Sequence, residues 1–403
     1  MNCRMKTILG YEIKKIIMKK STIIAFLLLF CIQLIISISG SFGNSYVNDV
    51  FLETHVDRNR IDRENGLSLS GRVIDDRLIT EVREAYSSID EDNCEYLTSD
   101  AYQHKIRKYS DLRQRLRLWG VDLSKSYDKE NILYELRQKE IDAMWDEYKL
   151  SDKEKEYWIE KEQELEKPFT YQYATAYEYL VDMSGMYMIS MLMTFFIAIT
   201  MVNVFAEEHN RKTDQLVLCS RYGRGKLYIA KLLAGSIIAF LANLIFLVMD
   251  LVGNFISYGS EGFKAMLQVT NVIWYSYQLS VGEALIIMIG LMLVSSIMIA
   301  LVVMLLAEIL RNNIGAMAII IGGLFAARLL MIPPKYGTLS KLWNYIPINI
   351  LKVDQGFTDP RLVSFFGIQL TTWKFAPILY TFIIVGICLI GSKLYKNYQI
   401  SGR

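Results

Sequence analysis

One glycine-rich segment of the chain, Gly223-Arg224-Gly225-Lys226, raises the question of phosphate chemistry. A P-loop binds nucleotide phosphates on the backbone between two widely spaced glycines, and a lysine followed by Ser or Thr completes it. Here a single residue separates the glycines and Leu227 follows the lysine, and no other segment fits the pattern. The sequence therefore excludes ATP binding of the P-loop kind on this chain.

Residues that bind metals or act as nucleophiles are sparse. The chain has 3 histidines, and none belongs to an H-E-x-x-H or another close metal pattern. Its 5 cysteines are scattered, and only Cys94 falls in a segment expected on the outer side of the membrane. We therefore expect no external disulfide within the chain. The apolar segments lack the His, Asp and Glu clusters of an intramembrane enzyme. We expect no catalysis, no metal and no cofactor on this chain.

The composition is that of a membrane protein. Apolar residues make up 52% of the sequence, and the net charge of +2 hides charges that are segregated between long uncharged runs. About 20 consecutive apolar residues cross a bilayer as a helix. We therefore predict an all-α polytopic membrane protein with six transmembrane helices and no nucleic-acid partner. The predicted spans lie at 22–39, 184–205, 232–256, 281–307, 314–332 and 375–391.

Basic residues at both ends predict the orientation. Residues 1–21 contain Arg4 and several lysines but one acid, Glu12, and their apolar residues recur at helical spacing. This pattern is typical of an amphipathic elbow helix in the membrane interface. The alternative is a signal peptide, which would need a small-residue cleavage site after the apolar run. Because basic segments stay inside, we expect both termini in the cytoplasm, and we expect a bacterial plasma membrane.

The polar residues 43–183 separate the first span, within 22–42, from the other five, within 184–403. They are too polar to cross, and they predict a mostly helical extracellular domain of two to four helices. Ser151-x-x-Glu154 is typical of a capping box at a helix start. The charge runs of this domain are typical of a solvated face, and the alternative is a role in guiding substrate or binding a partner.

Two further outer segments are predicted. The Phe and Tyr residues between 169 and 179 fit an aromatic belt at the membrane interface. Residues 335–374 lie between the last two spans and include an amphipathic stretch, 342–347. We predict that this outer segment re-enters the interface.

Two charges fall inside predicted spans, Asp250 and Arg328. Each costs roughly 2.5–3.5 kcal/mol at the bilayer centre, so such residues tend to have a function. At 1.5 Å per residue both fall in the outer half of the membrane at similar depths. The hypothesis is that they pair and line the transport pathway. The alternatives are a structural ion pair, or side chains that reach separately to the outer interface.

The most charged connection between spans is 206–231. It contains six basic residues and three acids, among them Glu207 and Glu208. Glu207 with Arg211, and Glu208 with Lys212, are spaced as i,i+4 helical pairs. The segment therefore predicts a short amphipathic helix on the cytoplasmic side. The alternative is a solvated basic loop that only follows the positive-inside rule.

This segment resembles the loop between the second and third spans of type-2 ABC exporter permeases. Lys212 stands where that family usually has Gly, and Cys219 where Pro is common. The resemblance implies that the loop binds a separate ABC ATPase subunit, which holds the ATP. The residues that carry the implied coupling role are Glu207, Glu208, Thr213, Leu216, Leu218, Arg221, Arg224 and Lys231.

The resemblance also implies a function and further partners. It implies a permease subunit that moves an amphiphilic substrate, namely a peptide, an antibiotic or a lipid, out of the cell. A second copy or a related permease would complete the pathway, and membrane lipids would contact the basic residues. The alternative function is a membrane-anchored sensor or scaffold that reads ligands through its external domain.

Overall fold

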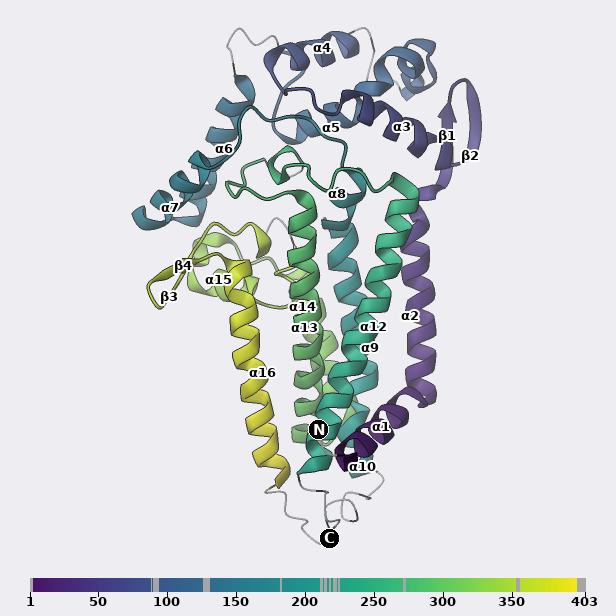
Figure 1. The fold of residues 1–403 in the computed structure, drawn as a ribbon, viewed down its shortest axis with the longest axis vertical. Helices are drawn as coiled ribbons and strands as arrows, with labels where there is room; N and C mark the ends of the chain where they lie inside the picture. Colours follow the sequence, from purple (N-terminus) through teal and green to yellow (C-terminus); the bar gives the residue numbers. More distant parts are fainter. Residues whose placement is uncertain are drawn as a thin grey trace.

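The computed structural model describes residues 3–396 except for gaps at 88, 90–93, 126–130, 182, 211–212, 214–215, 217–218, 220–222, 224, 271–272 and 353–355. The described residues form a helical bundle with a separate domain at its upper end (Figure 1). We call this domain, residues 42–174, the cap domain.

Among the described residues, five helical segments are long and apolar enough to cross a membrane. They contain the helices α2 (Lys20–Ile38), α9 (Met188–Met201), α12 (Lys226–Tyr258), α13 (Val281–Leu310) and α16 (Thr372–Lys396). The 30 residues of α13 reach about 45 Å. Helices therefore form where five of the six spans were predicted, because a long apolar run satisfies its backbone hydrogen bonds within itself.

The sixth predicted span, 314–332, forms a shorter helix. α14 (Asn313–Leu329) has 17 residues, which reach about 25 Å. It begins where the side chain of Asn312 accepts hydrogen bonds from the backbone N–H groups of Ile314 and Gly315. It ends at Leu329, because Leu330 turns extended ahead of Pro333-Pro334.

The second span begins earlier than predicted. Helical structure runs through α8 (Thr175–Val181), a π-turn η5 (Met183–Tyr187) and α9, and α10 (Asn203–Asn210) follows directly. The prediction began at 184 because Glu178 interrupts the apolar run. In the structure Glu178 is buried, with its carboxylate 2.9 Å from the guanidinium of Arg115. This ion pair offsets the cost of burying the charge of Glu178 in the packed structure.

The cap domain is more elaborate than predicted. A two-stranded hairpin, β1 (Phe42–Val47) with β2 (Val50–Thr54), precedes five helices, and both the hairpin and the helix count exceed the prediction. The helices are α3 (Val56–Leu69), α4 (Asp76–Ser87), α5 (Ser110–Leu118), α6 (Ile132–Tyr148) and α7 (Asp152–Gln163), with short turns η2 (Cys94–Thr98), η3 (Tyr102–Ile106) and η4 (Arg107–Tyr109) before α5. The predicted capping box of Ser151 and Glu154 starts α7 and is confirmed.

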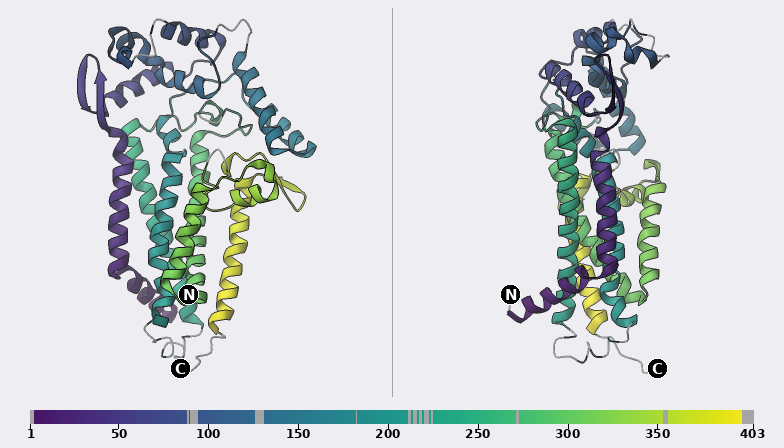
Figure 2. Two further views of the ribbon diagram at one scale, coloured as in Figure 1. Left: turned by 180° about the vertical axis from the view of Figure 1, so that it is seen from behind. Right: turned by 90° about the vertical axis from the view of Figure 1, so that its right-hand side faces the viewer.

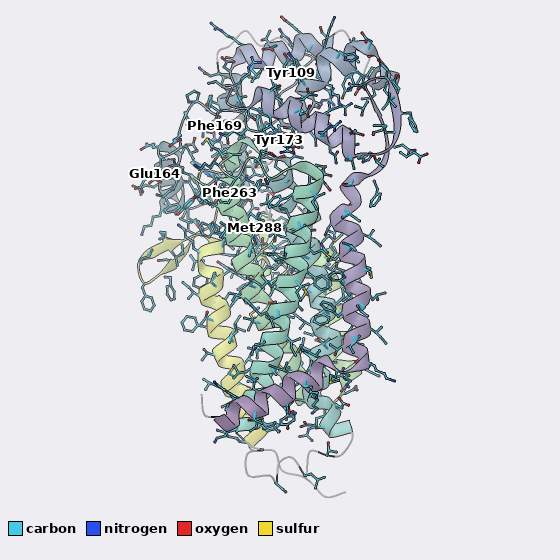
Figure 3. The ribbon with its side chains drawn as sticks, turned by 45° about the vertical axis from the view of Figure 1, so that its right-hand side comes forward. Tyr109, Glu164, Phe169, Tyr173, Phe263 and Met288 are labelled. Atoms are coloured by element: carbon cyan, nitrogen blue, oxygen red, sulfur yellow. The ribbon has the colours of Figure 1, made fainter. Side chains whose placement is uncertain are left out.

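Aromatic side chains form much of the packing below the cap domain. Phe169 and Tyr171 are fully buried, and Tyr173 and Tyr177 are nearly so. The interfacial belt predicted here is therefore wrong for these four residues, because they pack against protein. Figure 3 shows Tyr109, Phe169 and Tyr173 following one another down toward Phe263 and Met288.

The segment between α14 and α16 folds beside the upper end of α16. It contains η7 (Pro334–Tyr336), α15 (Thr338–Asn344) and a second hairpin, β3 (Val363–Phe365) with β4 (Ile368–Leu370). Helix α7 reaches over it (Figure 1). Trp158 Nε1 donates to the carbonyl of Pro360 at 2.6 Å, and the Leu362 amide donates to Glu154 at 2.8 Å.

Helix α1 (Cys3–Ile17) directly precedes α2 and lies at the end of the bundle opposite the cap domain (Figure 1). It crosses the foot of the bundle at a steep angle to α2, as both views of Figure 2 show. The helix predicted within 1–21 is thus present. Its basic and apolar residues are distributed as an interfacial helix requires.

Candidate functional site

Three helices meet at the lower end of the bundle. Helix α1 approaches from the side, α10 continues the second long helical segment, and α12 starts at Lys226 after Gly225 (Figure 1). The polar connection predicted at 206–231 therefore begins and ends within this junction. Charged side chains from all three helices point into it.

Lys231 and Glu208 form the centre of the junction. Lys231 is 0% exposed, and its Nζ lies 2.6 Å from Glu208 Oε1. The same ammonium donates to the carbonyl of Val204 at 3.0 Å and lies over the ring of Phe205, 4.8 Å from its centroid. A fully buried lysine is stable only when paired and hydrogen-bonded in this way.

Glu208 also binds helix α1. Lys15 Nζ lies 2.9 Å from the same oxygen, Oε1 of Glu208, so one carboxylate bridges α1 and α12. The neighbouring acid, Glu207, pairs with Lys19 at 2.7 Å, just after α1 ends. Two consecutive acids of α10 thus hold the joint between α1 and α2. We call Lys15, Lys19, Glu207, Glu208 and Lys231 the junction cluster.

The ion pairs of the junction cluster favour the charged forms of Glu208 and Lys15. Burial opposes ionisation of Glu208, but Lys231 and Lys15 outweigh it and hold the pKa of Glu208 below its usual value. Burial would lower the pKa of Lys15, but the hydrogen bond to Glu208 raises it above the ordinary lysine value. Glu12, in α1, is buried as well.

The structure partly answers the prediction of i,i+4 pairs in this segment. Arg211 and Lys212 lie outside the described residues, as do Leu218, Arg221 and Arg224 of the predicted coupling set. Among the described residues, Glu207 and Glu208 contact lysines far away in the sequence. Thr213 donates its amide to the carbonyl of Glu208 at 3.0 Å, which closes the end of α10.

Leu216 is the one described residue of the coupling set that projects from the protein. Its side chain is 77% exposed. It lies in the charged segment between α10 and α12. The set is therefore divided between buried residues that tie helices together and an exposed residue next to them.

Asp250 and Arg328 lie apart in the described structure, and the hypothesis that they pair within one chain is wrong. Asp250 is buried between α12 and α2, where Oδ1 accepts hydrogen bonds from Gln33 at 2.8 Å and from Ser37 at 3.0 Å. Arg328 is exposed near the end of α14, and its guanidinium lies over the ring of Tyr187 at 5.5 Å. The separation follows from the bundle, because α12 packs on α2 and α14 packs on α9 and α13.

A groove of about 260 Å³ opens beside Tyr187, between α9, α13 and α14. Its lining is almost entirely apolar and includes Met298, Gly323 and Ile348. Tyr187 packs against Leu324 and Ala327 of the same lining. Besides Arg328, the buried Lys352 lies over the Tyr187 ring at 5.3 Å. The groove thus has an apolar wall, and the two cations lie near it, against the ring of Tyr187, without lining it.

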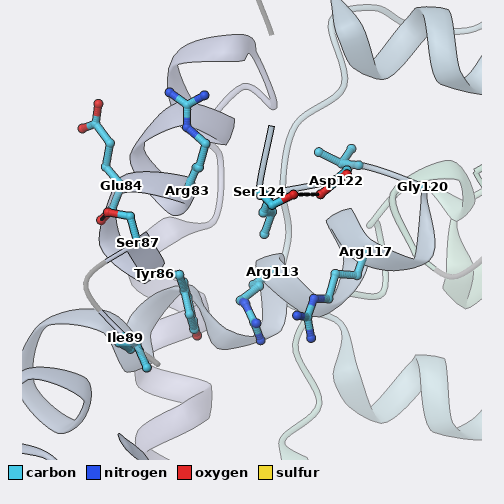
Figure 4. A pocket seen from close by; sticks show the side chains of 12 residues that line it. Arg83, Glu84, Tyr86, Ser87, Ile89, Arg113, Arg117, Gly120, Asp122 and Ser124 are labelled. Carbon is cyan, nitrogen blue, oxygen red and sulfur yellow. Dashed lines mark hydrogen bonds between the residues drawn. The ribbon is translucent and has the colours of Figure 1, made fainter. Parts of the chain in front are cut away.

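A larger pocket, of about 800 Å³, lies in the cap domain between α4, α5 and the turn after α5 (Figure 4). Arg83, Arg113 and Arg117 line it together with Glu84 and Asp122. The guanidinium of Arg113 lies over the Tyr86 ring at 4.2 Å. This pocket is far from the junction cluster, at the opposite end of the molecule, so it takes no part in joining α1, α10 and α12.

Sequence reasoning found Glu207, Glu208 and Lys231 but missed Lys15 and Lys19. These two lysines look like ordinary members of a basic interfacial helix. Their spacing of four residues, opposite two adjacent acids, is a signal only once α1 and α10 are known to meet. The contact is long-range, and nothing local in the sequence specifies it.

Comparison with known proteins gives one family. The sequence model of a family described as ABC-2 family transporter protein matches residues 72–351. That range contains α9, α10, α12, α13 and α14, and it includes three members of the junction cluster, Glu207, Glu208 and Lys231. No curated protein and no solved structure matches the chain.

Proposed function

The chain belongs to the ABC-2 transporter family, and on this premise we propose that it is the permease subunit of an exporter driven by a separate ABC ATPase. The family supplies the membrane component of an ABC transporter. Coupling to an ATPase and the direction of transport are the proposal. The junction cluster is the observation that carries it.

The geometry of the junction supports a mechanical role. An ATPase that binds the segment around Leu216 would press on α10 from the cytoplasmic side. Glu208 would pass this displacement to α12 through Lys231 and to α1 through Lys15, since the carboxylate touches both ammonium groups. Buried ion pairs transmit displacement well because breaking them costs about 3–5 kcal/mol.

The groove beside Tyr187 supports an amphiphilic substrate. Its apolar wall would take a hydrocarbon or an apolar side chain, and the exposed Arg328 nearby would attract an anionic headgroup. A lipid, an antibiotic or a peptide with an acidic end fits this chemistry. For Asp250, which accepts hydrogen bonds from Gln33 and Ser37 of α2, we propose a packing role.

A second permease, identical or related, would complete the pathway. Gly322 and Gly323 of α14 face open space in the single chain, where an added Cβ would meet nothing within 4 Å. Exposed glycines let another helix approach closely in a membrane. We propose that α14 serves as a sixth, shorter span, with both termini in the cytoplasm and the cap domain outside a bacterial plasma membrane.

Co-purification tests the proposal. The tagged chain is extracted from native membranes in mild detergent, and the eluate is assayed for a bound P-loop ATPase and for ATP hydrolysis. Leu216→Asp places a charge on the exposed surface without touching the buried cluster, and we expect it to abolish ATPase binding. Leu118→Asp changes another exposed leucine, in the cap domain, and should leave binding intact.

Two results would contradict the proposal. A chain that elutes without an ATPase from several detergents would remove its basis. A chain that elutes with a signalling protein would support the alternative, a sensor that reads ligands through the cap domain and its arginine-lined pocket.

A further inference from the structure

The hairpin β3–β4 has an unusual turn. Val363 pairs with Leu370 and Phe365 with Ile368, so the loop consists of Phe366 and Gly367 alone. Both residues have positive φ, 49° for Phe366 and 83° for Gly367. Two-residue hairpin turns with this backbone favour Asn-Gly or Asp-Gly, because short polar residues tolerate a left-handed conformation. A bulky aromatic residue is strained there.

The side chain of Phe366 contributes little to the fold. The Phe366 side chain is 91% exposed. Its ring packs against the ring of the neighbouring Phe365, with 4.6 Å between the centroids. On β4, the side chain of Ile368 is 65% exposed. A strained residue that gains so little burial indicates an interaction with something other than this chain.

The other hairpin of the chain provides a comparison. β1–β2 is also closed by two residues with positive φ, Asn48 at 46° and Asp49 at 65°. There the turn is polar, as the backbone prefers. The two hairpins share a backbone conformation and differ in the chemistry of their tips. Turn geometry therefore does not account for Phe366.

The positions of the two hairpins differ as well. β1–β2 stands upright at one side of the cap domain, to which it belongs, whereas β3–β4 projects sideways from the bundle at the level of the upper part of α16 (Figures 1 and 2). β4 ends two residues before α16 begins, and α16 is a membrane-spanning candidate. No charged residue occurs from Leu362 to Trp373. The tip thus lies where the outer edge of a bilayer would be.

We infer that the tip of β3–β4 inserts into the outer leaflet of the membrane, with Phe366 as its anchor. The exposed apolar surface of the tip continues the lipid-facing surface of α16, where Phe382 and Leu389 are also exposed. An aromatic side chain prefers the boundary between headgroups and acyl chains. One projecting ring is too small for a protein interface, which buries about 800 Å² on each partner.

Anchoring the tip would also hold the cap domain. The segment that leads into β3 is fixed to α7 through Trp158 and Glu154. In addition, the Arg361 guanidinium pairs with Asp359 at 2.6 Å and lies over the Tyr148 ring at 5.0 Å. A membrane contact at Phe366 would therefore set the height of α6 and α7 above the bilayer. This inference needs only a bilayer around the spans and does not depend on ATPase coupling.

Spin-label depth measurements test the inference in the full chain. In a variant without the native cysteines, a label at Ile368→Cys keeps Phe366 in place, and a label at Asn48→Cys marks the polar hairpin. Both are reconstituted into vesicles of phosphatidylcholine and phosphatidylglycerol. The accessibility of each label to oxygen and to a water-soluble nickel complex is then compared. We expect the label at 368 to favour oxygen by at least threefold over the label at 48.

Phe366→Asn sharpens the test, because Asn suits the turn and keeps the hairpin folded. With the label at 368, this substitution should move the oxygen preference toward the value at position 48. Equal nickel accessibility at 368 and 48 in the unsubstituted background would place the tip in water and overturn the inference. A label at 368 shielded from both reagents would also overturn it, since a second copy or another protein would then cover the tip.

Discussion

Glu208 Oε1 lies 2.6 Å from the Nζ of Lys231, and the lysine of this pair is fully buried at the start of α12. Lys15 reaches the same oxygen from α1. One carboxylate therefore pairs with a buried lysine and with a half-exposed one. The stability of the junction and its proposed coupling role can be tested separately, because they depend on different consequences of this arrangement.

The first prediction concerns removal of the carboxylate charge. Glu208→Gln leaves Lys231 buried without a counter-charge, and we expect it to destabilise the protein by about 3–5 kcal/mol. Adding Lys231→Met replaces the buried pair by apolar and neutral groups and should restore most of that stability, since such replacements are often neutral. Thermal unfolding in detergent measures both variants.

Coupling should not recover along with stability. The double variant lacks the ion pair that links α10 to α12. The rate of ATP hydrolysis by the complex should therefore no longer change when transported substrate is added. Glu156→Gln, on the exposed side of α7, serves as the control for loss of a carboxylate. A double variant as unstable as Glu208→Gln would contradict the prediction, because the cost would then not come from the unpaired lysine.

The second prediction concerns Asp250. Its Oδ2 has no hydrogen-bond partner and lies in the same buried site as Gln33, whose Oε1 is also without one. Asp250→Asn should be at least as stable as the natural protein, because the amide can still accept from α2 and adds a donor. Asp250→Ala should lose about 1–3 kcal/mol, because it removes the buried acceptor that Gln33 and Ser37 share. The melting temperature measures both.

Transport by Asp250→Asn distinguishes a packing role from a pathway role. With a packing role, export by the Asn variant should match that of the natural protein. Lost export at an unchanged melting temperature would show that the carboxylate itself belongs to the pathway.

The third prediction is a pH dependence of the cap domain. Glu81 accepts from Arg72 at 2.5 Å and from the hydroxyl of Tyr109, and the Arg72 hydrogen bond is the main cause that lowers the pKa of Glu81 to about 2. A carboxylate with a depressed pKa contributes stability that is complete above its unfolded value of about 4.3 and is lost as the pH falls toward 2. Glu81→Gln should therefore be destabilised at pH 7 and match the natural protein near pH 2.

Hydrogen exchange of the cap domain between pH 7 and pH 2 measures this difference. Because Arg72 and Glu81 are each about two-fifths exposed, solvent weakens the effect. Glu84→Gln, one turn further along α4, is the control. A constant difference between Glu81→Gln and the natural protein at all pH values would contradict the prediction.

Much of the bundle could be predicted because apolar runs are local. The five long helices lie where hydropathy placed them, and Ser151 with Glu154 marked the start of α7 correctly. The errors have long-range causes. The predicted second span began too late in the chain, because Arg115, the partner that allows Glu178 to be buried, is distant in sequence.

The same reason limited the prediction of the candidate site. Glu208 and Lys231 were recognised through a resemblance, but their pairing with each other and with Lys15 depends on how three helices meet. Asp250 and Arg328 were predicted to lie at similar depths in the membrane, yet depth does not specify which helices are neighbours. Side-chain packing determines which helices of a bundle lie next to each other.

The fourth prediction concerns the charge of Arg328 near the groove. Arg328 lies over Tyr187 on an exposed part of α14, so Arg328→Gln should change stability by less than about 0.5 kcal/mol. If Arg328 attracts an anionic headgroup, this variant should lose stimulation of ATP hydrolysis by anionic amphiphiles and keep stimulation by neutral ones, whereas Arg328→Lys should keep both. ATPase assays of the purified complex with dodecyl sulfate analogues and neutral alkyl glycosides, below micelle-forming concentrations, measure the difference. An equal loss for both classes would mean that Arg328 supports the groove rather than selecting its substrate, because only a headgroup interaction depends on the charge of the amphiphile.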